Sequence, residues 1–471
     1  MLCPSVRAIA RSLSRSALAV AAIVAASSIS SAQSSPPEDG VVIQKRDAAI
    51  PDTQRAASVN AMYFDPLQGV SSSDLVRMVL ASNIDLAAAR LDIERARGRL
   101  RQAGLRPNPT FDFEQSSGRF TNSPGDRETS VGFALPLEVG GQRQRRIDLA
   151  RVQLEAAEAE IADRERRLAA EVRAAHLEAL ALLMELEITG QFNSNDAQTA
   201  RIVEARVTEG ESAPLELNLV RVEVDRLRSR RSLIEGRLEG ALLRLKSLTG
   251  ISLEEPLRLR ETLTQAVLPE PPASMEDAAD IALRSRPDAR LARLNERVAE
   301  AGLRLAQAEG KPDVIVSARY SFDRSIIDLP EPLVSFPDPS RRLSFGVSFE
   351  LPIARRNQGA TAEATVIVSQ ARRRREFTEQ LVRHEVASAY KRYDASRIAL
   401  ATFERGVLGA SALNIRTIRE AYRLGAFRVT DVLTEERRLI DSQQQYIELL
   451  TERHRALIDL HSALASPMPL Q

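Results

Sequence analysis

Few side chains in this 471-residue sequence have the types and spacing that chemistry requires. The four histidines are scattered along helical segments, at His176, His384, His454 and His461. The last two could share a helix face, but no cysteine or paired carboxylate joins them, as a zinc site would need. Gly140 and Gly141 are too few and wrongly spaced for a phosphate-binding loop, and no Ser-His-Asp arrangement can be recognised in the sequence. We therefore expect no enzymatic activity, no cofactor and no metal site.

The composition indicates which elements must carry whatever function the chain has. Lys+Arg is 65 against Asp+Glu 64, so the net charge of +1 gives no electrostatic reason to expect a nucleic-acid partner. Aromatic residues are only 4% and Trp is absent, while 44% of residues are hydrophobic. This balance is typical of long helices and coiled coils. After the N-terminus no stretch reaches the ~20 apolar residues of a transmembrane helix.

Residues 1–32 have the pattern of a secretory signal. Three arginines precede a short apolar run over 17–26, and small residues end at Ala32. A membrane anchor is the less favoured alternative, because the apolar run is shorter than a membrane span. Cys3 is the only cysteine and would leave with the signal, so we expect an exported chain without disulfides.

The mature chain contains the same pattern twice, after a loosely ordered N-terminal arm predicted at 33–72. Asp85 matches Asp288, Pro136 matches Pro352, and Gly210 matches Gly425. Each half predicts a helix, two strands, a long helix, a glycine turn and a second long helix. We place the first repeat at 73–250, an equatorial linker at 251–275, the second repeat at 276–465 and a C-terminal tail at 466–471.

The predicted strands, at about 110–118, 128–136, 313–323 and 342–351, alternate large apolar with small or polar residues. This period of two suits strands with one face in lipid and one in a lumen, although a soluble hairpin on a small core is the alternative. Four strands cannot close a barrel, so several chains would have to share one, and three chains would give twelve strands. The predicted lipid-facing residues are Val131, Phe133, Phe345, Val347 and Phe349.

Two long helical hairpins are predicted, at 140–249 and 357–465. An apolar seam with alternating three- and four-residue spacing runs through Leu217, Val220, Val224, Leu227, Ile234, Leu238, Ala241, Leu245 and Leu248, broken only by Arg231. A similar seam in the second hairpin is broken by Glu435 and Arg453. Both predict coiled-coil packing. The basic run 372–375 is interpreted as a solvated face or a contact with a neighbouring subunit.

The segment 421–433, AYRLGAFRVTDVL, resembles the inner helical tip of the TolC family of outer-membrane efflux channels. The segment 135–143, LPLEVGGQR, is similar to the strand-to-helix junction of the CzcC-like heavy-metal branch of that family. The resemblance implies a mainly α fold with a membrane β part, in which a homotrimer forms a 12-stranded β-barrel in outer-membrane lipid and a 12-helix periplasmic α-barrel. It also implies a periplasmic adaptor and an inner-membrane pump, commonly of the resistance–nodulation–division type.

The same resemblance implies the site residues. The family's aperture aspartate falls on Asp431 and its nearby tyrosine on Tyr422, while Glu216 is the repeat-related partner of Asp431. The residue three after Asp431, often acidic in the family, is Thr434 here, which lowers the gate charge. The alternative is that Asp431 only caps its helix. The adaptor-contacting turns fall on Gly210, Glu211, Gly425, Ala426 and Phe427.

We therefore predict a passive export duct of a tripartite efflux system in the outer membrane, with its helices in the periplasm. Divalent heavy-metal cations are the suggested substrates. Drug or solvent efflux and type I protein secretion stay open as alternatives. From other classes, a periplasmic structural coiled-coil protein would have no use for the alternating strands, and an adaptor would have one helical hairpin instead of two.

Overall fold

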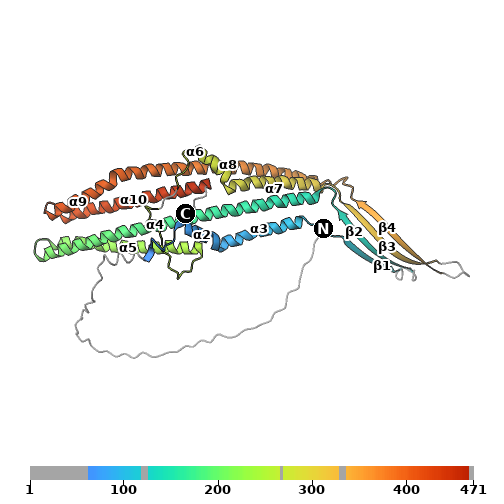
Figure 1. Ribbon diagram of the computed structural model, residues 1–471, viewed down its shortest axis with the longest axis horizontal. Coiled ribbons are helices and arrows are strands. Elements are labelled where there is room, and N and C mark those ends of the chain that lie inside the picture. The colour runs from blue at the N-terminus through green and yellow to red at the C-terminus, as the bar shows by residue number, and fades with distance from the viewer. Residues whose placement is uncertain (1–61, 118–125, 266–268, 328–335, 466–471) are drawn as a thin grey trace, which may run out of the picture. The chain divides into compact units, whose positions relative to one another are not determined.

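The computed structural model describes residues 62–117, 126–265, 269–327 and 336–465 (Figure 1). The predicted signal segment, most of the predicted arm and the C-terminal tail lie outside these ranges. Within them, none of the helices combines the length and the apolar character needed to cross a membrane.

The two halves of the chain contain matching elements in the same order. The first half consists of α2 (Ser72–Ser82), α3 (Ile84–Ala103), β1 (Thr110–Ser117), β2 (Arg127–Leu137), α4 (Gln142–Thr208) and α5 (Pro214–Thr249). The second consists of α6 (Met275–Ser285), α7 (Pro287–Glu309), β3 (Val314–Ile327), β4 (Phe336–Phe349), α8 (Gln358–Phe403), a π-helical turn (Glu404–Leu408), α9 (Gly409–Arg423) and α10 (Val429–Leu464). The last helices of the two halves, α5 and α10, are each 36 residues long.

In each half, a serine at the end of the first helix is hydrogen-bonded to the end of the last helix. The Ser82 hydroxyl at the end of α2 donates to the carbonyl of Thr249 at the end of α5, at 2.6 Å. Ser285 makes the equivalent bond to the carbonyl of Leu464 at the end of α10, also at 2.6 Å. The last carbonyls of a helix lack partners within it, so these hydroxyls satisfy groups that would otherwise be unpaired.

The residues that follow these two serines, Asn83 and Arg286, also make equivalent hydrogen bonds, although their side chains differ. Asn83 donates from its amide to the carbonyl of Leu248 at 3.1 Å, and Arg286 donates to the carbonyl of Ala463 at 3.4 Å. Both residues are the N-cap of the following helix. The internal repeat predicted from sequence spacing is therefore a repeat of individual contacts.

The helices pack along the predicted seams. In α5 the buried apolar side chains are Val220, Val224, Leu227, Ile234, Leu238, Ala241, Leu242 and Leu245. The last five form part of the main core, and α5 packs mainly against α4. Arg231, the polar break in this seam, pairs with Glu235 at 2.9 Å. The second hairpin packs on the first through contacts of α10 with α4 and α5.

The four strands form one antiparallel sheet in the order β1-β2-β3-β4 (Figure 1). The two halves of the chain meet in its middle, where β2 pairs with β3 from Arg127↔Arg324 to Leu137↔Val314. The hairpin of β3 and β4 is longer than the expected spans, because β4 begins at Phe336. Its early residues include Pro337 and Pro339, which an edge strand tolerates.

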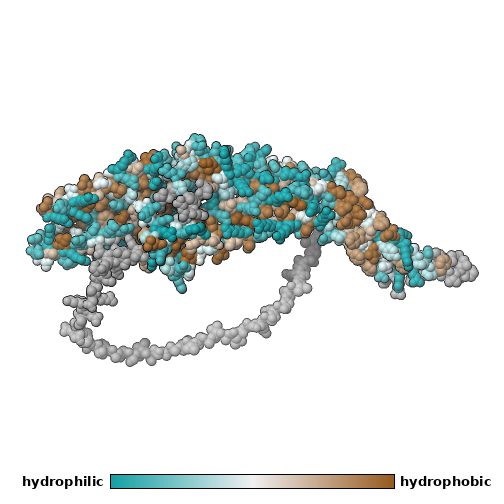
Figure 2. Space-filling view, in the orientation of Figure 1, coloured by the Kyte–Doolittle hydropathy of each residue, from teal (hydrophilic) through white to brown (hydrophobic). Residues whose placement is uncertain are grey.

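The strand register collects the apolar side chains on one face. Phe111 pairs with Phe133, Phe133 with Ala318, and Ala318 with Phe345, so these residues form one row across all four strands. Figure 2 shows hydrophobic residues gathered over the part of the sheet next to the helices, with hydrophilic residues toward its far end. The five predicted lipid-facing residues are exposed, from 38% for Val131 to 78% for Phe345.

The opposite face is polar. Arg319 on β3 reaches across β2 to Glu114 on β1 at 3.2 Å and also donates to the Ser130 hydroxyl at 3.0 Å. Gly132 lies beside Arg319 and Asp112 and leaves room for this crossing. The apolar face of the sheet is therefore not covered by the described part of its own chain.

One expectation needs correction and another is confirmed. The end of the predicted loose arm is folded, because Phe64 and Val70 form bridges to Leu259, which is fully buried, and Tyr63 is buried beside them. The basic run 372–375 is largely a solvated face, as predicted, because Arg372, Arg373 and Arg374 are exposed. Arg372 and Arg375 both pair with Glu296 of α7 in the same chain, at 3.4 and 2.7 Å.

Candidate functional site at the helical turns

The two hairpin turns share one backbone geometry. Gly210 and Gly425 have φ of +79° and +78°, the left-handed region that favours glycine after the end of a helix. Pro214 then begins α5 at a position where proline is well tolerated. The predicted adaptor-contact residues Glu211, Ala426 and Phe427 are all exposed at these turns.

Asp431 and Glu216 occupy equivalent places, because each is in the first turn of its helix. A carboxylate of Asp431 accepts the backbone N–H of Arg428 at 3.0 Å. Both acids are half-buried and lie at the positive ends of helix dipoles, which favour negative charge. The structure therefore assigns Asp431 a capping contact and leaves its predicted gate role untested.

Tyr422 ties the second hairpin to the first. The Arg206 guanidinium of α4 lies over its ring, 5.4 Å from the centroid. The ring also packs against an apolar cluster formed by Val203, Val220, Val429 and Leu433, which come from α4, α5 and α10. The Tyr422 hydroxyl is buried without a hydrogen-bond partner among the described residues. Its predicted place near the aperture thus coincides with a contact between hairpins.

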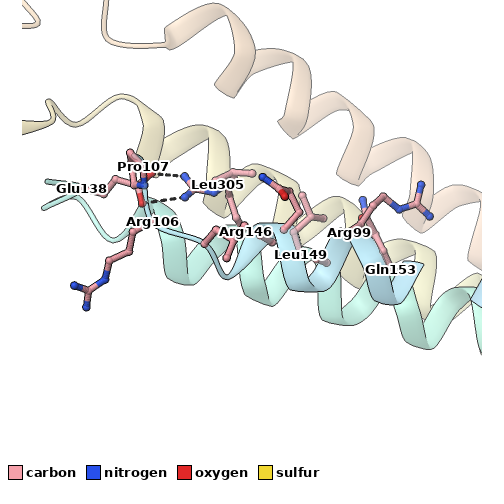
Figure 3. Close-up of a pocket in the computed structure, with 12 residues that line it drawn as sticks. Arg99, Arg106, Pro107, Glu138, Arg146, Leu149, Gln153 and Leu305 are labelled. Carbon is pink, nitrogen blue, oxygen red and sulfur yellow. Dashed lines mark hydrogen bonds and ion pairs between the residues drawn. The ribbon is translucent and has the colours of Figure 1, made fainter. Parts of the chain in front are cut away.

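The strand-to-helix junction of the first repeat is shown in Figure 3. Glu138 forms a two-pronged ion pair with Arg146 of α4, with one arm at 2.9 Å, beside a groove of ≈ 610 Å³ that Arg99 and Arg106 also line. A Cβ on Gly140 would lie 2.8 Å from the Lys311 side chain, so close packing requires the glycine. These contacts hold α4 against the sheet.

The histidines offer no metal site among the residues that the structure covers, where no group of three or more His, Cys, Asp or Glu side chains could bind a metal ion. His176, His454 and His461 are buried and His384 is exposed. Burial lowers the pKa of His176 to about 4, so the ring is neutral at pH 7.

A family model for outer membrane efflux proteins matches residues 75–251 and 278–466. The chain belongs to the outer membrane efflux protein family. The cobalt-zinc-cadmium resistance protein CzcC of Cupriavidus metallidurans is 24% identical over 382 residues, which cover 80% of this chain and 86% of that protein. Both predictions, the family and the outer-membrane location, are confirmed.

Solved structures agree on the fold. CusC matches with a TM-score of 0.70 and 23% identity over 83% of this chain and 91% of CusC. The open-state structure of the MtrE outer membrane channel of Neisseria gonorrhoeae matches with a TM-score of 0.67 and 18% identity over 83% of this chain and 88% of MtrE. The predicted TolC-like fold is therefore confirmed for this outer membrane efflux protein.

One group of charged residues was missed by sequence reasoning. Asp196 of α4, Glu223 of α5 and Glu436 of α10 are 0%, 2% and 3% exposed. Glu435 was identified as a break in the α10 seam, but the neighbouring Glu436 is the residue that is almost fully buried. Only the packing of α10 against α4 and α5 distinguishes the two.

Proposed function

We propose that this efflux protein is a passive duct that three chains build together. The observation that carries the proposal is the sheet with one apolar face, one polar face and two outer strands, β1 and β4, that have no partner on their outer sides among the described residues. Unpaired strand edges are not tolerated in lipid, so neighbouring chains would supply the missing partners. Three chains would close a barrel of about twelve strands with a lumen.

The duct would act with a periplasmic adaptor and an inner-membrane pump, and would itself catalyse no reaction. Exposed apolar side chains at the second turn, Leu424 at 79% and Phe427 at 48%, support an adaptor contact there. Likeness to CzcC supports divalent cations such as cobalt, zinc and cadmium as substrates. A strain lacking this gene should become sensitive to these metals, whereas sensitivity to lipophilic drugs alone would favour drug efflux.

Asp431 would form a ring of carboxylates at the inner aperture, with Tyr422 and Glu216 beside it. Such a ring favours cations and narrows the opening. The test separates charge from capping, because asparagine retains an oxygen that can accept the Arg428 N–H. In planar bilayers, Asp431→Ala should raise the single-channel conductance and Asp431→Asn should lower the preference for cations.

The exposed acid Asp441, farther along α10, provides the matched control. Asp441→Asn should leave conductance and ion preference unchanged. If Asp431→Asn behaves as the wild type while Asp431→Ala does not, Asp431 is a capping residue only. A purified chain that is a water-soluble monomer would overturn the duct itself.

A further inference from the structure

The three buried carboxylates lie between two apolar layers where the hairpins meet. Toward the turns lies the cluster of Val203, Val220, Val429 and Leu433. On the other side lies a second cluster, formed by Phe192, Leu227, Ile415, Leu439 and Ile440. We call Asp196, Glu223 and Glu436 the carboxylate layer. It joins α4 and α5 of the first hairpin to α10 of the second.

Two of the three acids have arginine partners. Glu223 accepts from Arg437 of α10 at 2.8 Å and from Arg226 of α5 at 3.4 Å. Glu436 accepts from Arg419 of α9 at 2.9 Å. The charged groups that face the layer are therefore Asp196 from α4, Glu223 and Arg226 from α5, Arg419 from α9, and Glu436 and Arg437 from α10.

Asp196 has no such partner. Neither of its carboxylate oxygens accepts a hydrogen bond from a described residue, although the side chain is fully buried. An isolated buried carboxylate is costly, and such a group normally takes up a proton. The carboxyl of Glu436 is within reach of Asp196, so a protonated Asp196 can donate a hydrogen bond to it. Two adjacent carboxyl groups that share a proton titrate as a unit.

We propose that Asp196 and Glu436 share a proton that holds the two helical hairpins together near their turns, and that loss of this proton releases them. With the proton bound, Asp196 donates one hydrogen bond to Glu436 across the contact between α4 and α10. Without it, Asp196, Glu436 and Glu223 are all ionised between two apolar layers and repel one another. The layer thus makes the hairpin contact stronger at low pH and weaker at high pH.

The shift in proton affinity agrees with this geometry. Burial, reinforced by the charge of Glu436, raises the pKa of Asp196 to about 8. Burial also raises the pKa of Glu436, although Arg419 opposes the change. The proton is therefore present at neutral pH and is lost just above it. If three chains form the proposed duct, release of the hairpins near their turns would widen its inner aperture; the proton-dependent contact itself does not depend on the duct.

Infrared spectroscopy of the detergent-solubilised mature protein can detect the shared proton directly. The wild type should show a protonated carboxyl band that disappears with a midpoint near pH 8, and Asp196→Asn should lack it. Burial also raises the pKa of Glu261, so Glu261→Gln is the control that must retain the band. Absence of a band that titrates between about pH 7 and 9 in the wild type would overturn the proposal.

Release of the hairpins is measured with a spin label on Ala426→Cys, at the exposed turn between α9 and α10. Label mobility should rise through the same pH range in the wild-type background, stay low in Asp196→Asn, and rise normally in Asp441→Asn. Equal pH responses in wild type and Asp196→Asn would refute the proposal. If Asp196→Asn does not fold, Glu436→Gln tests the same pair. This experiment measures no ion conduction, so its result can be interpreted even if the proposed duct function is wrong.

Discussion

Replacing Arg286 with methionine should weaken the join between α7, α8 and α10. The Arg286 side chain is only 3% exposed and donates to Asp288 at 2.6 and 3.0 Å and to the carbonyl of Ala463 at 3.4 Å. It also pairs with Glu385 of α8 at 2.7 Å. Methionine can occupy much of the same space, so the change removes charge and hydrogen bonds more than volume.

The magnitude follows from how well solvent reaches each partner. Loss of one partner of a buried ion pair costs roughly 3–5 kcal/mol. The Glu385 side chain is 45% exposed, so its share falls to about 0–1 kcal/mol. Asp288 is 22% exposed and keeps the N–H of Ala289 at 2.9 Å. We therefore expect Arg286→Met to lower the free energy of unfolding by about 2–3 kcal/mol.

Denaturant unfolding in detergent, followed by circular dichroism, measures the loss. Arg284→Met, two positions away on an exposed site, is the matched control and should change stability by less than about 0.5 kcal/mol. Burial alone would raise the pKa of Asp288, but the Arg286 guanidinium holds it below its usual value. This stabilisation is complete above the unfolded pKa and is lost as pH falls through the lower folded pKa. The gap between wild type and Arg286→Met should therefore shrink below about pH 4. Equal losses in both variants would refute the reasoning.

Two further predictions concern pH and backbone geometry. Burial lowers the pKa of His176 to about 4, so as pH falls the unfolded chain takes up a proton at this residue before the folded chain does. The free energy of unfolding should therefore decrease as pH drops from about 6.5 to 4. Thermal unfolding of His176→Leu should show a smaller decrease over this range. Gly425→Ala should destabilise the second hairpin by about 1 kcal/mol because its φ is +78°, whereas Gly98→Ala, within α3 and with open space around it, should be neutral or slightly stabilising in the same assay.

Features with a short period could be predicted from the sequence. The α5 seam through Val220, Leu227 and Leu238 is a helix period, and the strand faces that carry Phe133 and Phe345 follow a period of two. Such patterns arise because each element buries one face against one partner surface, so they can be recognised in the sequence of that element alone. The repeat could also be recognised, because matching elements keep the same spacing along the chain.

Contacts that need several elements at once were not predictable. Asp196 lies in α4, which packs against α3, α5, α7 and α10, so its buried face changes along its length and no single period marks the residue. Glu436 differs from Glu435 only by a rotation about α10. The folded end of the arm depends on Leu259, far away in the chain, and Glu296 pairs with a basic run that looks solvated by itself.

The two hairpins differ in the continuity of their long helices. The long helix of the first half, α4, is continuous over 67 residues, whereas its counterpart is interrupted by the π-helical turn at Glu404–Leu408 before α9 begins. Single π-helical turns inside α-helices are frequently found at functional sites. Beyond this turn, α9 packs mainly on α10, and that pair is tied to the first hairpin through Tyr422 and the carboxylate layer. The shared proton of the carboxylate layer therefore joins a continuous α4, which is linked to the sheet end through Glu138 and Arg146, to a hairpin that has a break in its long helix.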